Sequence, residues 1–205
     1  MNKLTKYISE PKFVIDIGAN IGEFSKSICN LYPNCDFVLF EANPNCEKYL
    51  KELPFKYFIS GLSDKKGTHK FHIENINPIA TGASIYKENS IYYETNKYNT
   101  IEINSDTLDS FKLYENDVDL IKIDTQGSEL DIINGGITTL QNSKYLLIEV
   151  SLTNYNINAP LFDVINEKLT NIGYRIVDII DYHKFTNGDI FQMDVLYHNV
   201  NYENS

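Results

Sequence analysis

The sequence predicts an α/β fold, a doubly wound and mostly parallel sheet whose C-terminal strand is reversed. Three observations predict this class. Short apolar runs recur along the chain with little polar alternation, as in parallel strands that are covered on both faces. Helix-like segments separate these runs. Asn187-Gly188, near the C-terminus, is a strong signal for a hairpin, which would add an antiparallel strand.

The elements can be assigned in chain order. The strands we expect are residues 12–17, 36–41, 55–60, 118–124, 144–150, 174–182 and 190–199. The helices we expect are residues 23–32, 44–53, 128–140 and 160–171. Pro44 suits the first turn of its helix, and Gly173 is a typical helix stop.

Residues 61–117 interrupt this alternation. Residues 64–68 form a turn, residues 70–74 are compatible with a short strand, and residues 75–100 are polar and rich in Asn, Tyr and Ser. An irregular insertion of this length is either functional or a surface excursion, so a substrate lid and a plain loop both stay open. We expect residues 1–205 to form a single domain with this insertion.

Composition narrows the function classes. The net charge is −10 with a pI near 4.8, and no cluster of Lys and Arg offers a track for phosphates. We therefore expect no nucleic-acid partner and no anionic membrane surface, whereas a neutral or cationic small substrate fits. No apolar run is long enough for a membrane span or a signal peptide, and the three cysteines lack the spacing of a zinc site. These features favour a cytoplasmic protein with reduced thiols and no predicted metal site.

The segment from Asp16 to Phe24 carries the most information about function. An apolar strand, a turn with Gly18 and Gly22, and a helix together form a corner that is typical of nucleotide sites. Asn20 fills a position where dinucleotide sites want less side chain, and the Asp16 carboxylate would repel a pyrophosphate. This favours S-adenosylmethionine over NAD, although an ordinary tight turn between strand and helix also fits.

Acidic residues end four of the expected parallel strands, at Asp16, Glu41, Asp124 and Glu149. Ligands of open α/β sheets bind beyond these strand ends, so the acids should meet at one edge. A carboxylate at Glu41 is suited to accept hydrogen bonds from both hydroxyls of a ribose. The alternative is a strand-end acid that caps the next helix.

Lys122 lies inside an apolar strand, where an unpaired ammonium group is expensive to bury. By topology, its nearest partners should be Glu149, Asp124 and Glu129. A structural ion pair and a role in orienting the substrate are equally compatible with the pattern.

Asp124 is the best candidate for removing a proton from a hydroxyl group, because it ends the same strand as Lys122. Glu129 can also be read as a charge at a helix N-terminus. The histidines are expected on the surface or in packing, and His183, next to the hairpin, is the best placed of them for a role in the site. They are His69, His72, His183 and His198.

These residues resemble the FkbM-type methyltransferases, a class I S-adenosylmethionine-dependent family. The resemblance covers about residues 12–150 and rests on three segments, 14–22 with 40–44, 107–109, and 119–130 with 148–150. The most specific segment is 119–130, since it makes the buried lysine a family feature. Gln126 departs from the pattern, because many members have an acid there.

The resemblance implies a seven-stranded Rossmann-like sheet, S-adenosyl-L-methionine as cofactor, and methyl transfer to a hydroxyl of a sugar or natural product. It also assigns residues by position. Those expected to bind the cofactor are Asp16, Gly18, Asn20, Gly22, Glu41, Gly61, Leu62, Ser63 and Asp64. Those expected to line the reaction site are Lys122, Asp124, Glu129 and Glu149.

Two other functions compete with this hypothesis. A methyltransferase fold can serve as a binding module for the cofactor or a glycan without turnover. An NAD-linked oxidoreductase is the other, and Asn20 together with the missing middle glycine counts against it.

Overall fold

The computed structural model describes residues 3–89 and 98–202. Its larger sheet has seven strands in the order β3-β2-β1-β7-β8-β10-β9. The five strands from β3 to β8 pair in parallel, and β10 pairs antiparallel with both β8 and β9. The bounds of these strands are β1 Phe13–Ile17, β2 Asp36–Glu41, β3 Lys56–Ile59, β7 Val118–Ile123, β8 Ser143–Ser151, β9 Tyr174–Lys184 and β10 Ile190–Asn199. The predicted fold class is confirmed.

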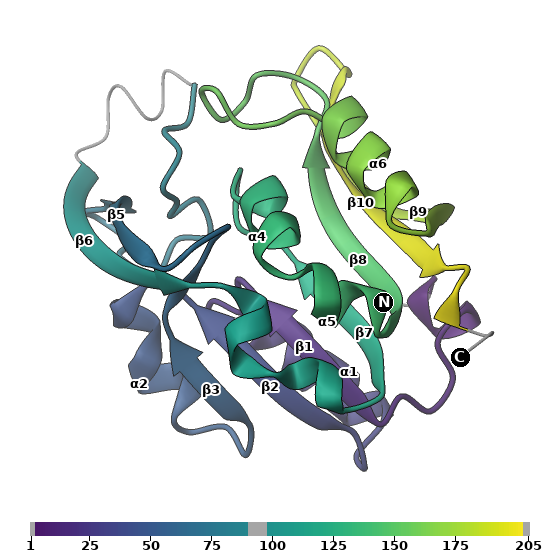
Figure 1. Ribbon diagram of the computed structural model, residues 1–205. Helices are drawn as coiled ribbons and strands as arrows, with labels where there is room; N and C mark the ends of the chain where they lie inside the picture. Colours follow the sequence, from purple (N-terminus) through teal and green to yellow (C-terminus); the bar gives the residue numbers. More distant parts are fainter. Residues whose placement is uncertain (1–2, 90–97, 203–205) are drawn as a thin grey trace.

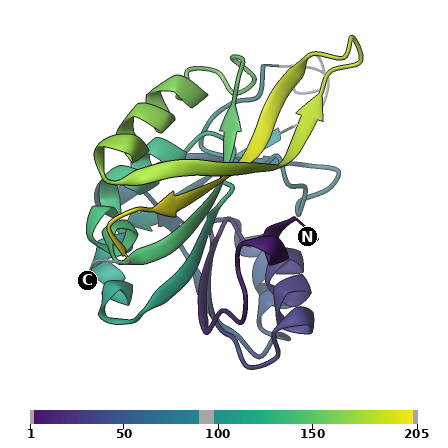
Figure 2. The same cartoon turned by 90° about the vertical axis from the view of Figure 1, so that its right-hand side faces the viewer.

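Helices cover both faces of this sheet (Figures 1 and 2). One face packs against α4, α5 and α6, and the other against α1, α2 and the N-terminal turn η1. The bounds of the helical segments are η1 Leu4–Lys6, α1 Glu23–Leu31, η2 Pro44–Cys46, α2 Glu47–Leu50, η3 Leu108–Phe111, η4 Leu113–Glu115, α4 Glu129–Gly135, α5 Ile137–Gln141 and α6 Phe162–Asn171.

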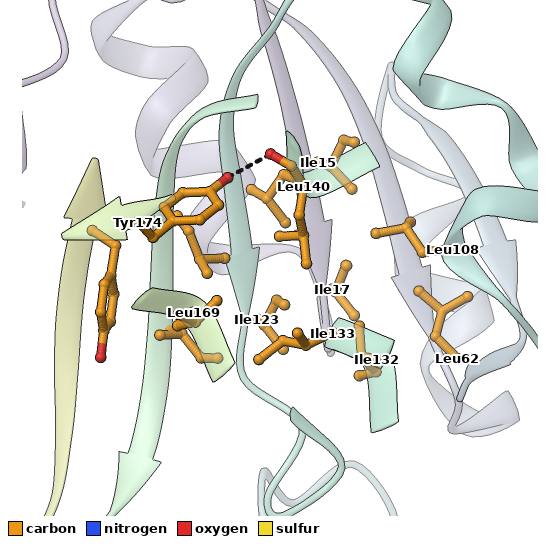
Figure 3. Packing of buried hydrophobic residues seen from close by; sticks show 14 of the residues in the cluster. Ile15, Ile17, Leu62, Leu108, Ile123, Ile132, Ile133, Leu140, Leu169 and Tyr174 are labelled. Atoms are coloured by element: carbon orange, nitrogen blue, oxygen red, sulfur yellow. Dashed lines mark hydrogen bonds between the residues drawn. The ribbon is translucent and has the colours of Figure 1, made fainter. Parts of the chain in front are cut away.

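The strands contribute alternate residues to two hydrophobic clusters. Val14 belongs to the cluster under α1, whereas Ile15 belongs to the cluster under α4 and α5, because neighbouring residues of a strand point to opposite faces. Figure 3 shows the second cluster, in which the buried Tyr174 hydroxyl donates a hydrogen bond of 2.7 Å to the carbonyl oxygen of Leu140. Because both faces of these parallel strands are buried, the strands stand out in the sequence as continuous apolar runs.

The expected irregular insertion instead contains a second sheet of three strands in the order β4-β6-β5. Their bounds are β4 Gly61–Leu62, β5 Gly67–Glu74 and β6 Tyr98–Asp106. Strand β6 was not expected, since its residues are mostly polar; only its inward-facing positions are apolar or small. Residues 90–97 of the expected polar stretch lie outside the described residues.

Two expected helices are shorter than the sequence pattern suggests. The expected helix at 44–53 is one 3-10 turn followed by a single α-turn. The expected helix at 128–140 is divided at Gly136 into α4 and α5. A side chain at Gly136 would press on Leu108, so this glycine lets η3 approach the break closely. Among the described residues, no helix is both long and apolar enough to span a membrane.

Candidate active site

The turn after β1 brings two strand ends together. Gly18 has a φ of +75°, and a Cβ at this position would overlap the carbonyl oxygen of Asp124 at the end of β7. Gly22, with a φ of +80°, begins α1 against Leu53. Asn20 between them also adopts a left-handed conformation, which asparagine tolerates better than most residues. The two glycines are therefore required for the shape of the turn.

A cavity of about 1130 Å³ opens beyond the carboxyl ends of the parallel strands. Its position is the one expected for ligand sites in open α/β sheets. The predicted site residues that line it are Gly18, Asn20, Glu41, Gly61, Leu62, Lys122, Asp124 and Glu149. The predicted site residues that do not line it are Asp16, Gly22, Ser63, Asp64 and Glu129.

Glu41 forms part of the cavity wall. Its two carboxylate oxygens accept hydrogen bonds from the backbone N–H groups of Asn20, at 2.6 Å, and Asn43, at 2.7 Å. Burial raises the pKa of Glu41, and the two N–H donors oppose that rise. Each oxygen keeps a further lone pair, so the fixed carboxylate can still accept hydrogen bonds from a ligand.

Lys122 is paired with two acids at the centre of the site. Its Nζ lies 3.2 Å from Asp124 Oδ2 and 3.6 Å from Asp16 Oδ1. Asp16 and Lys122 are direct neighbours in the register of β1 and β7. Burial alone would lower the pKa of Lys122, but the two carboxylates raise it above its usual value, so the side chain stays charged.

Of the partners expected for Lys122, only Asp124 is found. The expectation of Glu149 and Glu129 was wrong, since both have other partners and Lys122 forms its ion pairs with Asp16 and Asp124. Asp16 is fully buried and also accepts a hydrogen bond of 2.7 Å from Ser25 Oγ in α1. Asp16 therefore lies behind the cavity wall, where it contacts Lys122 but does not line the cavity.

Glu149 is held by two amide side chains. Its Oε2 accepts hydrogen bonds from Gln126 Nε2, at 2.5 Å, and Gln192 Nε2, at 3.1 Å. Burial, followed by the nearby acids Asp124, Glu129 and Asp194, raises the pKa of Glu149 to about 9. At neutral pH this carboxyl group therefore holds a proton.

Glu129 shapes the loop after β7. Its Oε1 accepts hydrogen bonds from the backbone N–H groups of Thr125, at 3.0 Å, and Gly127, at 3.1 Å, and from the Thr125 hydroxyl at 3.0 Å. Gln126, between these residues, has a φ of +59°. The buried glutamate thus fixes a strained turn that directs the Gln126 side chain to Asp124 and Glu149.

A segment of the insertion, residues 77–89, crosses the cavity; we call it the strap. The side-chain amide of Asn20 donates a hydrogen bond of 3.0 Å to the carbonyl of Ile79, and that of Asn43 donates one of 2.7 Å to the carbonyl of Pro78. At its other end, the backbone N–H of Asn89 donates to the carbonyl of Tyr155 at 2.6 Å. Sequence reasoning located this insertion but not the residues that anchor it.

The C-terminal hairpin supplies lining residues that sequence reasoning missed or gave little weight. Phe191 and Gln192 of β10 and His183 of β9 line the cavity, and His183 Nε2 lies 3.9 Å from Glu149 Oε1. Alternation along the two strands and the Asn-Gly turn signal carry some of this information, but only the pairing of β10 with β8 brings the hairpin to the site. His69 also lines the cavity, whereas His72 and His198 do not.

These features define a doubly wound α/β protein with a cofactor-type cavity at the strand ends and paired acids and amides beside it. Residues 16–176 match the Methyltransferase FkbM domain, which is more than half of the chain. The chain therefore belongs to the FkbM methyltransferase family.

One curated protein and two solved structures are similar to this chain. The 2-O-methyltransferase NoeI of Sinorhizobium fredii is 27% identical over 152 residues, which are 67% of this chain and 63% of the relative, so the chain spans less than two thirds of that protein's length. The structure of an FkbM methyltransferase from Methylobacillus flagellatus superimposes with a TM-score of 0.58 at 15% identity, covering 91% of this chain and 44% of that one. A magnesium protoporphyrin IX methyltransferase from Synechocystis, solved with bound SAM, gives 0.54 at 7% identity, with 97% and 75% covered. At these identities the two structures show the shared fold.

Proposed function

We propose that this protein is an S-adenosyl-L-methionine-dependent O-methyltransferase that acts on a hydroxyl group of a sugar or small natural product. One observation carries the proposal. A single cavity is lined by the fixed Glu41 carboxylate and also by Asp124, Gln126 and Glu149. The family match and the similarity to the 2-O-methyltransferase NoeI support the same reaction class.

The cavity wall fits the cofactor of this class. Glu41 offers carboxylate oxygens to a pair of ribose hydroxyls, because backbone N–H groups hold it in place. We propose that Gly18, Asn20, Gly61 and Leu62 complete the wall on either side. Asp16 and Gly22, and Ser63 and Asp64 near β4, would act from behind the wall by fixing its shape.

Charge favours a sulfonium cofactor over a dinucleotide. Among the described residues that line the cavity, Lys122 is the only lysine or arginine, and it is already paired with Asp16 and Asp124. A pyrophosphate would find no free cation there, whereas nearby carboxylates stabilise a positive centre. An NAD-linked reaction is therefore disfavoured.

When bound, S-adenosylmethionine supplies an activated methyl group to a nucleophilic oxygen. The chain has to position that oxygen and receive its proton. Asp124 is the best candidate for the proton acceptor, because it is partly exposed in the cavity and fixed by Lys122 and Gln126. Glu149, which holds its own proton at neutral pH, is suited to hydrogen-bond the acceptor. Glu129 acts through the loop that it orders.

We also propose that the strap closes over the bound molecules. The side chains that anchor it belong to Asn20 and Asn43, whose backbone N–H groups bind the carboxylate of Glu41. The residues proposed to contact the cofactor therefore also hold the strap. Excluding water in this way would strengthen the electrostatic contacts beneath the strap.

The test is methyl transfer from isotope-labelled S-adenosylmethionine to a panel of sugars and small hydroxylated compounds. We expect a methylated product with the wild type and, for Asp124→Asn, a loss of about a hundredfold or more in kcat with cofactor affinity kept. Asp163→Asn, an exposed change in α6, is the matched control and should retain activity. Cofactor binding without transfer to any acceptor would instead support the binding-module function.

A further inference from the structure

The cavity extends well beyond the wall assigned to the cofactor. Its far end lies at β8 and the hairpin of β9 and β10, where Tyr155, His183, Phe191 and Gln192 join Glu149 in the lining. Pockets for a single small molecule span roughly 300–1,000 Å³. A volume of about 1130 Å³ therefore leaves room for a second ligand beside the cofactor.

The far end has an aromatic wall. The ring of Phe191 lies 4.8 Å from that of Tyr155 and 4.5 Å from that of Phe185, with interplanar angles of 32° and 29°. Phe185 is 41% exposed and supports the ring of Phe191 from outside the cavity lining. Rings of this kind present apolar surface to the C–H groups of a sugar ring.

Polar groups face the same space. Gln126 and Gln192 are fixed side by side, since both donate to Glu149 Oε2 and Gln192 Nε2 lies 3.4 Å from Gln126 Oε1. His183 adds a donor or acceptor at the rim, 3.9 Å from Glu149. A few fixed polar groups beside an apolar wall are what a site needs to select a polyhydroxylated ring.

The charge of the cavity restricts the substituents on such a ring. Six acidic side chains line the described part of the cavity, against the paired Lys122 and two histidines, and one of the six, Glu149, is protonated at neutral pH. The six are Glu23, Glu41, Glu74, Glu88, Asp124 and Glu149. A phosphate or carboxylate on the ligand would be repelled, whereas neutral and amine-bearing ligands would not.

Apart from residues 174–176 at the start of β9, the hairpin lies outside the family match, which ends at residue 176. His183, Phe191 and Gln192 therefore belong to the part of the chain that the shared methyltransferase domain does not define. The family match therefore includes the turn after β1 and Asp124 but does not include these three residues of the far wall.

We infer that the hairpin of β9 and β10 forms the acceptor subsite of this protein, and that it takes a neutral or amine-bearing saccharide ring and excludes phosphorylated sugars. This inference rests on the proposed methyltransferase function and adds the substrate class and the residues that select it. Phe191 and Tyr155 form the apolar wall, and Gln192 with Glu149 meets the hydroxyl groups.

The experiment measures ligand binding and so does not depend on turnover. The protein, saturated with S-adenosylhomocysteine, is titrated with methyl glucoside, glucosamine and glucose 6-phosphate, and binding is followed by saturation-transfer NMR. We expect binding of the first two sugars and binding of the phosphate that is at least about tenfold weaker. We expect Phe191→Ala and Gln192→Ala to weaken sugar binding by about tenfold with unchanged affinity for S-adenosylhomocysteine.

Tyr182→Ala is the matched control, because Tyr182 is an exposed aromatic residue next to His183 on β9 that does not line the cavity. Phe191→Leu, which keeps apolar volume but removes the ring, separates loss of the aromatic wall from misfolding. Binding of S-adenosylhomocysteine without either neutral or amino sugar would overturn the inference and leave the proposed function standing. Sugar binding unaffected at Phe191 and Gln192, or equal binding of the phosphate, would also overturn it. Failure to bind S-adenosylhomocysteine would instead contradict the proposed function.

Discussion

Lys122 connects the stability of the sheet to the chemistry of the site. Its ammonium group lies between Asp16, which is fully buried, and Asp124, which faces the cavity. A buried pair of this kind adds little over an apolar core, but removing one member leaves an uncompensated charge. Lys122 therefore holds Asp124 in place while adding little net stability. Removing Lys122 is destabilising, because it leaves a buried charge without a partner.

Replacing Lys122 with methionine should reduce the free energy of unfolding by about 3–5 kcal/mol, because Asp16 would keep its burial and lose its cation. Urea denaturation at neutral pH measures this change. Lys26→Met, which removes an exposed pair with Glu23, should cost less than about 0.5 kcal/mol. Equal stability of the two variants would contradict the role assigned to Lys122.

Glu149 makes the unfolding free energy depend on pH. Its pKa in the folded protein is about 9, above the ordinary 4.5, so the folded state binds the proton more tightly than the unfolded state. This contribution is fully present below pH 4.5 and is lost as pH rises towards 9. Glu149→Gln keeps the shape of the side chain but removes its ionisable group. The free energy of unfolding of this variant, relative to the wild type, should therefore increase as the pH rises from 4.5 to 9. Urea denaturation across this range checks the sign, and parallel curves for the two proteins would exclude the raised pKa.

At the scale of elements, the turn after β1 depends on one glycine for its close approach to β7. A side chain at Gly18 would meet the backbone of Asp124, whose N–H donates a hydrogen bond of 3.1 Å to the carbonyl of Ile17 at the end of β1. Gly188, in the turn between β9 and β10, also has a positive φ but has open space around it. Comparing alanine substitutions at Gly18 and Gly188 therefore separates the cost of backbone strain from the cost of steric overlap.

Gly188→Ala should lower the unfolding free energy by about 1–2 kcal/mol, the usual cost of a left-handed alanine. Gly18→Ala carries the same strain plus the overlap with Asp124, so it should be clearly more destabilising and should also weaken cofactor binding. Thermal unfolding and titration with S-adenosylhomocysteine measure the two effects. Similar losses at both positions would show that β1 and β7 are not this close.

The sequence predicts the seven strands of the larger sheet well, because burial on both faces leaves apolar runs that end at polar turns. It does not predict the three-stranded sheet. Strand β6 is largely polar, and its pairing with β5 joins residues far apart in the chain. The division of the helix at Gly136 was also missed, since it depends on the tertiary contact with Leu108.

The site residues also divide into those that local sequence predicts and those that depend on tertiary contacts. The strand-end acids and the glycine turn are local in sequence, and five of the residues predicted from them line one cavity, namely Gly18, Asn20, Glu41, Asp124 and Glu149. The partner Asp16 of Lys122 depends on the register between β1 and β7, and the contact of Gln192 with Glu149 depends on the reversed β10. Neither pairing can be read from spacing along the chain.

At the scale of the whole molecule, charge and topology both favour two small ligands that are not polyanions. The net charge of −10 and the acidic cavity are both unfavourable for a polyanionic ligand, so the absence of a nucleic-acid partner stays a prediction. The doubly wound sheet places the cofactor wall and the hairpin at opposite ends of one cavity, so a methyl donor and an acceptor can meet between them, near Asp124.

The central claim is that this cavity binds S-adenosylmethionine through Glu41. Calorimetric titration with S-adenosylhomocysteine, on the wild type and on Glu41→Ala, tests it most directly. We expect one-to-one binding by the wild type and a loss of affinity of about tenfold or more in the variant, which lacks the fixed carboxylate. No binding by the wild type, or equal binding by both proteins, would contradict it.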